Sequence, residues 1–267
     1  YEPLSEPRVS RDEIWWVKSF YEKACGALAR ADPDAACMVG STPYYSRADL
    51  DQVVIPHVTN TIYAFNFFFP KVYVMNSLDG ASYPSNFRCC DAYTLDHVCK
   101  ASWGKPGCDR PVFVAKDKLK AEIEVAVGFG RKHNVPLFMD QWAISSSFRL
   151  PGSALDRGRA NYVRDVLSLA DDFGLSYAYW NGRQAVKESD STAFGLLTIE
   201  SDESSVGGKR SWWNDDLFVA LAPHLAAGAE PNAPREGRAP LSRETWGARA
   251  WGASGEPTRA AAPPSPP

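Results

Sequence analysis

The stretch at residues 135–144, VPLFMDQWAI, decides how the rest of the chain is interpreted. Its first five residues are all apolar, which is typical of a strand buried on both faces of a parallel sheet. The stretch then becomes polar and aromatic at Asp140, Gln141 and Trp142 and continues into a serine-rich loop. In barrels of alternating strands and helices, functional side chains lie where the carboxyl end of a strand meets its following loop. We therefore take Gln141 and Trp142 as the first candidate site residues.

Three other segments show the same change from an apolar strand to a polar or aromatic end. They are YEPLSEPR at 1–8, NTIYAFNFFFP at 60–70 and LSYAYWNGR at 175–183, and a shorter apolar run at 36–40 predicts one more strand. Amphipathic patterns between them predict helices at 12–30, capped by Ser10 or Asp12, and at 47–54, 115–133 and 153–172, the last capped by Ser153. Strands that alternate with helices favour a parallel α/β architecture.

In this order and spacing, the segments resemble the second half of glycoside hydrolase family 5, a retaining (β/α)8 barrel of the cellulase and mannanase type. Ser5-Glu6-Pro7 matches the Asn-Glu-Pro that ends the family's fourth strand, where the Glu is the acid/base. Trp180 matches the tryptophan that floors the family's sugar site. The resemblance implies an α/β fold over residues 1–225, an incomplete (β/α)8 TIM barrel with strands four to eight and their helices.

The segments follow the order of the family's strands, but several residues at the family's site positions differ from the family's residues. Asn66-Phe67-Phe68 stands where the family has His-x-Tyr on its sixth strand, and Gln141 stands in place of the nucleophile Glu that ends the seventh. An amide carries no charge to stabilise an oxocarbenium-like transition state, so Gln141 cannot be that nucleophile. Asp140 is adjacent, but strand alternation points it to the opposite face, toward the helices, unless a bulge re-aims it.

Two functions remain open on these residues. In the first, the chain belongs to a glycoside hydrolase that acts on O-glycosidic bonds of a β-linked polysaccharide or oligosaccharide, with Glu6 and Gln141 in the catalytic places. In the second, it is a non-catalytic, carbohydrate-binding pseudo-glycosidase. Neither function calls for a cofactor or a metal, and the residues expected to bind the sugar are Asn66, Phe68, Trp142, Trp180, Tyr44 and Tyr45.

Composition and charge argue against several other classes. The 267 residues are 45% hydrophobic and 23% charged, as in soluble globular proteins. A net charge of −3 provides no electrostatic basis for binding nucleic acid or an anionic membrane, and no run of about 18 apolar residues predicts a membrane span. Tyr1 already lies at an expected strand end, so we expect a processed or truncated product that requires an N-terminal barrel half. Without that half, open sheet edges should leave the fold marginally stable.

The six cysteines predict an oxidising compartment. Cys89, Cys90, Cys99 and Cys108 cluster in a long insertion at 71–117, which favours at least one disulfide there and an extracellular or secretory location. A zinc site with nearby His97 is the weaker alternative, because adjacent cysteines fit a Cys-x-x-Cys spacing badly. The other two, Cys25 and Cys37, are expected to be buried small apolar groups.

The remaining elements complete the expected order. Gly174 should stop the helix before the strand at 175–180. An added β segment is expected at 193–199 and a closing helix at 212–225. From 226 to 267 the chain is rich in Ala, Pro and Gly with little periodicity, which predicts a disordered tail instead of a second domain.

Overall fold

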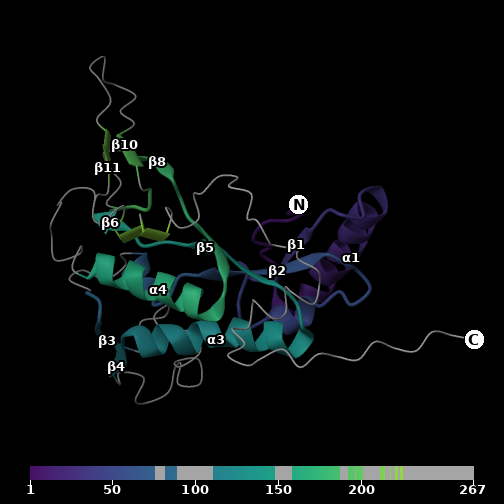
Figure 1. Ribbon diagram of the computed structural model, residues 1–267, viewed down its shortest axis with the longest axis horizontal. Coiled ribbons are helices and arrows are strands. Elements are labelled where there is room, and N and C mark those ends of the chain that lie inside the picture. The colour runs from purple at the N-terminus through teal and green to yellow at the C-terminus, as the bar shows by residue number, and fades with distance from the viewer. Residues whose placement is uncertain are drawn as a thin grey trace, which may run out of the picture.

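The centre of the molecule is a sheet of four parallel strands, seen here in a computed structural model (Figure 1). The strands are β1 (Cys37–Gly40), β2 (Thr61–Phe67), β5 (Leu137–Trp142) and β7 (Ser176–Tyr179), in that spatial order. The structure describes residues 1–75, 82–88, 111–147, 158–186, 192–195, 197–200, 211–213, 217, 220, 221, 223 and 224. Because the strand order follows the chain order, every crossover advances in one direction, and right-handed crossovers then put the helices on one face. The predicted parallel α/β architecture is confirmed.

Helix α1 (Ile14–Ala31) precedes the sheet and begins through a single 3-10 turn, η1 (Arg11–Glu13). The Ser10 hydroxyl donates to Oε2 of Glu13 at 2.8 Å, and the Ser10 backbone N–H donates to the same oxygen at 3.3 Å. This is the returning half of a capping box in front of the 3-10 turn. The N-cap of α1 itself is Glu13, which makes no side-chain cap hydrogen bond, so the predicted cap at Ser10 or Asp12 is wrong for this helix. The buried residues of α1 recur at spacings of three and four, as the predicted amphipathic helix requires: Ile14, Val17, Tyr21 and Cys25.

A disulfide joins α1 to β1. Cys25 and Cys37 are bonded, with their Cα atoms 5.6 Å apart, and both are buried. The expectation that they are merely buried apolar groups is therefore wrong, because α1 lies close enough to the start of β1 for Cys25 to bond to Cys37. The cysteines for which disulfides were predicted, Cys89, Cys90, Cys99 and Cys108, lie outside the described residues together with His97.

Two long helices cover the middle of the sheet and lie side by side in Figure 1. Helix α3 (Lys116–His133) forms where a helix was predicted at 115–133 and buries Leu119, Ile123, Val127 and Phe129. Asn134 then turns the chain into β5 from a left-handed conformation (φ 50°). Helix α4 (Arg159–Phe173) ends at Gly174 as predicted. It begins after Gly158 (φ 79°), not at Ser153, which lies outside the described residues. Gly158 is required there because a Cβ would meet the carbonyl oxygen of Tyr83.

Smaller sheets surround the parallel one. Between residues 71 and 117 the described parts are a short helix, α2 (Lys71–Val74), and an antiparallel pair, β3 (Ser85–Arg88) with β4 (Pro111–Val114). Strand β6 (Ser146–Ser147) pairs with β9 (Thr192–Ala193). A three-stranded sheet holds β8 (Arg183–Val186), β10 (Leu197–Glu200) and β11 (Ser211–Trp213).

The C-terminal elements differ from their predictions. The segment expected at 193–199 is divided between β9 and β10. The closing helix expected from 212 is wrong at its start, because Trp212 pairs in β11, although Leu217, Ala220 and Leu221 are helical and buried. The tail at 226–267 lies outside the described residues. Within the described ranges, no helix combines the length and the apolarity needed to cross a bilayer.

Candidate functional site

A β-bulge interrupts β5 at its carboxyl end. Phe65 of β2 pairs with Met139 of β5, and Phe67 pairs with Trp142. The chain therefore advances two residues in β2 between these pairs but three residues in β5. One extra residue is therefore inserted in β5, and Asp140 and Gln141 together lie opposite the single residue Asn66. The same shift occurs against β7 on the other side of β5.

The register places Asp140 on the side of the sheet away from the helices. Tyr63 of β2 packs against Phe129 of α3, so the residues of β2 that alternate with Tyr63, including Ala64 and Asn66, face away from α3. Phe138 pairs with Ala64 and therefore shares that face, as does Asp140 two residues later. The expectation that Asp140 points toward the helices is wrong.

The electrostatics of Asp140 agree with this placement. Burial raises its pKa to about 6, and the negative charges of Glu2 and, to a smaller extent, Glu6 act in the same direction. A hydrogen bond with the Gln141 side chain opposes the rise. Asp140 therefore lies within electrostatic reach of both glutamates of the N-terminal segment. Sequence reasoning missed Glu2, although Glu2 and Glu6 are four residues apart and would share a face in an extended segment.

Glu6 and Asn66 are in direct contact. The Asn66 Nδ2 donates to Oε1 of Glu6 at 2.6 Å, across 60 residues of sequence. Asn66 is only 8% exposed, and its Oδ1 has no hydrogen-bond partner among the described residues. The predicted site residue Asn66 thus meets the predicted acid Glu6, and its carbonyl oxygen is left available.

The loop after β1 holds the segment that carries Glu6. The hydroxyl of Tyr45 lies 2.7 Å from Oε1 of Glu2 and 2.6 Å from the carbonyl oxygen of Leu4. The carbonyl oxygen of Pro7 accepts from the Thr42 hydroxyl at 3.0 Å and from the backbone N–H of Tyr44 at 3.1 Å. Both sides of Glu6 are therefore anchored to one loop.

The same loop also reaches β2 and the beginning of the chain. The carbonyl oxygen of Tyr45 accepts from the backbone N–H of Asn66 at 3.0 Å. Tyr1 makes two ladder-type bonds beside β1, donating its ammonium to Ala36 O and accepting from Met38 N, each at 2.7 Å. The relative position of Glu6 and Asn66 is thus determined by backbone contacts as well as by their own hydrogen bond.

Of the five aromatic residues expected to bind the sugar, two are exposed, two are buried and Phe68 is half-buried. Trp180 is 38% exposed and Tyr44 46%, with the Arg8 guanidinium 4.7 Å from the centre of the Tyr44 ring. Tyr45 and Trp142 are completely buried. Tyr45 lies over Gly40, where a Cβ would collide with its ring, and Trp142 lies on the helix side with Phe67, its partner in the register.

Trp180 belongs to a cluster of three rings. The ring of Phe68 lies 6.5 Å from that of Trp180, and Phe194 lies 5.2 Å from Trp180 and 6.5 Å from Phe68. Phe68 is therefore a partner of Trp180. Phe194 was not predicted, because it comes from the loop after β9 and no periodic pattern marks it.

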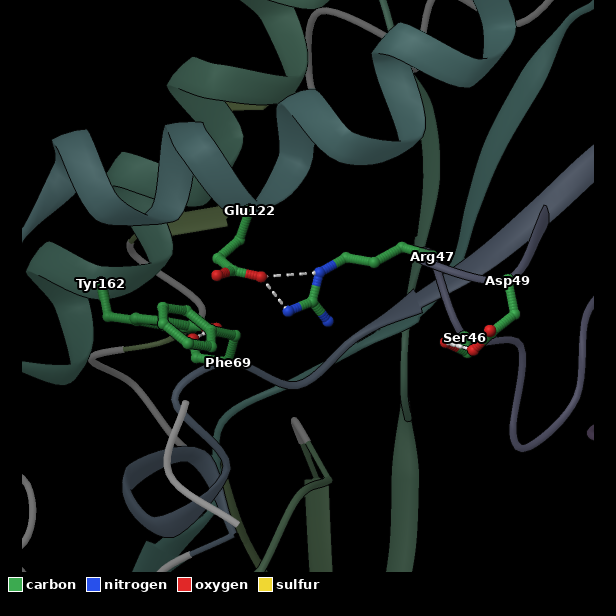
Figure 2. A network of polar contacts seen from close by, with 6 residues as sticks. All are labelled: Ser46, Arg47, Asp49, Phe69, Glu122 and Tyr162. Atoms are coloured by element: carbon green, nitrogen blue, oxygen red, sulfur yellow. Dashed lines mark hydrogen bonds and ion pairs between the residues drawn. The ribbon is translucent and has the colours of Figure 1, made fainter. Parts of the chain in front are cut away.

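A buried ion pair supports the loop from the helix side. Figure 2 shows Arg47 extending to Glu122 of α3, with Phe69 and Tyr162 beside the pair. The Arg47 Nε donates to Oε2 of Glu122 at 3.0 Å, and its Nη2 contacts the same oxygen. The guanidinium carbon lies 5.9 Å from the ring centre of Phe67 and 5.7 Å from that of Phe69. The loop that anchors Glu6 on one side of the sheet is therefore anchored to α3 on the other.

The described residues hold no group of three or more His, Cys, Asp or Glu side chains arranged to bind a metal ion. The donors near Glu6 are amide and hydroxyl groups, and the acceptors are carboxylates and the Asn66 carbonyl oxygen. This arrangement can orient a polyhydroxylated ligand and exchange protons with it.

The described fold is similar to several solved structures. The cellulose synthase subunit Z (CcsZ) of Clostridioides difficile matches with a TM-score of 0.51 and 19% identity, over 82% of this chain and 60% of that one. The endoglucanase Cel5A of Thermotoga maritima matches with 0.52 and 16%, over 82% and 58%. A GH5-4 broad specificity endoglucanase of Clostridium longisporum matches with 0.53 and 16%, over 82% and 56%. No protein-family model and no curated protein matches the chain.

The chain therefore has a fold like that of glycoside hydrolase family 5 enzymes, and it spans less than two thirds of the length of these structures.

Proposed function

We propose that this chain is part of a glycoside hydrolase that acts on O-glycosidic bonds of a β-linked polysaccharide or oligosaccharide, with Glu6 and Asp140 as its two carboxyl groups. The observation that carries the proposal is the register of β5 on β2, in which Phe138 pairs with Ala64, so that Asp140 faces the same side of the sheet as Asn66 and Glu6. Glycoside hydrolysis needs one carboxyl group that donates a proton and one that is ionised. The fold and the exposed Trp180 support the same substrate class.

The two carboxyl groups differ in environment. The pKa of Asp140 is raised to about 6, which suits the group that protonates the leaving oxygen. Glu6, whose Oε1 accepts a hydrogen bond from the Asn66 amide, takes the other role, in which a carboxylate attacks the anomeric carbon or activates water. Gln141 orients Asp140 through their hydrogen bond and takes no covalent role. These roles reverse the part that the family resemblance gives to Glu6.

A second function is supported by Gln141. If catalysis requires a carboxylate at the position where the family has its nucleophile, the amide of Gln141 at that position leaves a site that binds glycans without cleaving them. Trp180 and Tyr44 would then be stacking surfaces only.

The proposal includes a preceding barrel half. A (β/α)8 barrel closes with eight strands, and the parallel sheet described here has four, with β7 paired on one side only among the described residues. We also propose an extracellular or secretory location, which the Cys25–Cys37 disulfide supports.

Release of reducing ends from β-glucans and β-mannans tests this function, using the chain together with any N-terminal half that it natively carries. We expect hydrolysis, and we expect Asp140→Asn and Glu6→Gln each to lower the rate by about 10²- to 10⁴-fold, the usual contribution of a proton-transferring group. Glu124→Gln on the exposed face of α3 is the matched control and should leave the rate unchanged.

Binding measured on the same samples separates the two functions. Glycan binding without any release of reducing ends would favour the non-catalytic alternative. Hydrolysis that survives Asp140→Asn would remove Asp140 from the mechanism.

A further inference from the structure

The site around Glu6 has an excess of negative charge. Glu2, Glu6 and Asp140 are close enough for both glutamates to raise the pKa of Asp140. None of the three forms an ion pair with a Lys or Arg of the described residues. Arg8 is the cation nearest to Glu6 in sequence, and its guanidinium lies over the ring of Tyr44. The negative charge is therefore not balanced from within the described part of the chain.

The site also has an unused acceptor. Asn66 is 8% exposed, its Nδ2 is occupied by Glu6, and its Oδ1 has no partner among the described residues. A buried acceptor without a donor is costly, so its presence beside a ligand site points to a ligand that brings the donor. Asn66 Oδ1 and the carboxylates together give a site with many hydrogen-bond acceptors and few hydrogen-bond donors.

We propose that this site selects glycans by charge, binding a sugar that carries an ammonium group, such as a 2-amino-2-deoxy sugar, more tightly than the corresponding neutral sugar and rejecting a uronate. An ammonium group brings three N–H donors and a positive charge to a place rich in acceptors and negative charge. A uronate brings a further carboxylate, and like charges oppose its binding. The inference rests on the proposed glycan site and adds its substrate class.

Burial is the largest cause of the raised pKa of Asp140, and the charges of Glu2 and Glu6 add to it, which agrees with the three carboxyl groups lying close together.

Equilibrium binding of three β-1,4-linked oligosaccharides of equal length tests the inference by calorimetry. The probes are a glucosamine oligomer, a cello-oligosaccharide and a cello-oligosaccharide with one glucuronate, all in a low-salt buffer acidic enough to protonate the amine. We expect the glucosamine oligomer to bind about three- to tenfold more tightly than the neutral probe, and the glucuronate probe to bind more weakly by a similar factor. In about 1 M salt, where screening is strong, the three affinities should converge.

Glu2→Gln tests the effect of the negative charge of Glu2 alone, because the amide has nearly the same size and its oxygen can still accept the hydrogen bond from Tyr45. It should reduce the preference for the glucosamine oligomer over the neutral probe by about two- to threefold. Glu124→Gln makes the same change of net charge on α3, where Glu124 lies 3.9 Å from Lys120, and should leave the preference intact.

Equal binding of the three probes at low salt would overturn the inference and leave the proposed glycan site standing. An equal loss of preference in Glu2→Gln and Glu124→Gln would also overturn it, because the effect would then come from net charge. If Glu2→Gln does not fold, the salt series on the unmodified chain decides. If no probe binds at all, the proposed function fails together with the inference.

Discussion

At the scale of single residues, the site depends on which way Asp140 points. With Gln141 on the site face, as the family resemblance implies, regular alternation along β5 would place Asp140 on the helix face. The bulge adds one residue between Met139 and Trp142, so Trp142 returns to the helix side and Asp140 stays with Phe138 on the other. The pairing of Phe138 with Ala64 therefore decides that the site has a second carboxyl group beside Asn66.

Asp140 should make the fold less stable as the pH rises. Its pKa in the folded chain is about 6, whereas an unfolded Asp titrates at about 3.9. The folded state therefore binds the proton more tightly, and the stability that protonated Asp140 contributes is fully present below about pH 4 and is lost between about pH 4 and pH 6.

Urea unfolding of the chain and of Asp140→Asn across this pH range measures the effect. We expect the free energy of unfolding of the unmodified chain to fall by about 1 kcal/mol relative to the variant, after allowance for solvent screening. A difference that stays constant with pH would show that Asp140 is not perturbed.

At the scale of elements, the loop after β1 connects both sides of the sheet. Tyr45 and Thr42 hold the segment that carries Glu6, while Arg47 crosses to Glu122 of α3. Arg47 is 7% exposed and Glu122 4%, so neither charge has an alternative partner in water. A buried pair of this kind adds little net stability over apolar residues, but losing one member leaves the other uncompensated.

Glu122→Gln should therefore destabilise the fold by about 3–5 kcal/mol, the usual cost of breaking a buried pair. Replacing both members, with Arg47→Met and Glu122→Leu, should cost less than Glu122→Gln alone. Chemical unfolding of these variants provides the comparison, with Glu124→Gln on the exposed face of the same helix as the control, expected within about 0.5 kcal/mol of the unmodified chain. Similar unfolding midpoints for the two Glu→Gln variants would contradict the role given to the pair.

At the scale of the whole molecule, covalent and strand contacts hold the beginning of the chain to the sheet. The Cys25–Cys37 disulfide joins α1 to β1, and Tyr1 pairs beside β1. The segment that carries Glu6 lies between these two connections, so its position follows from the assembled molecule and not from its own sequence.

Thiol titration in denaturant without reductant tests the redox state of the whole chain. Of the six cysteines, two are joined in the Cys25–Cys37 disulfide, so at most four should react. Two reactive thiols would be the result if one bridge also forms among Cys89, Cys90, Cys99 and Cys108, as their clustering predicts. Six reactive thiols would exclude the disulfide and remove the support for an oxidising compartment.

The sequence by itself determined the kind, order and approximate limits of the main elements. The apolar stripes of α1 and α3, the strands that became β1, β2, β5 and β7, and the stop at Gly174 are all patterns within a few turns or residues of the chain. Such patterns record which face of an element is buried, and burial is the main force that assembles a parallel α/β fold.

Only the tertiary structure decided the site. The contact of Glu6 with Asn66, the facing of Asp140, the burial of Tyr45 and the disulfide each depend on residues that are distant in the sequence or on one inserted residue in a strand. Periodicity cannot register a bulge, because a shift of one residue reverses the expected face of every side chain beyond it. For the same reason, which of these side chains come together at the site is decided by how the strands pair.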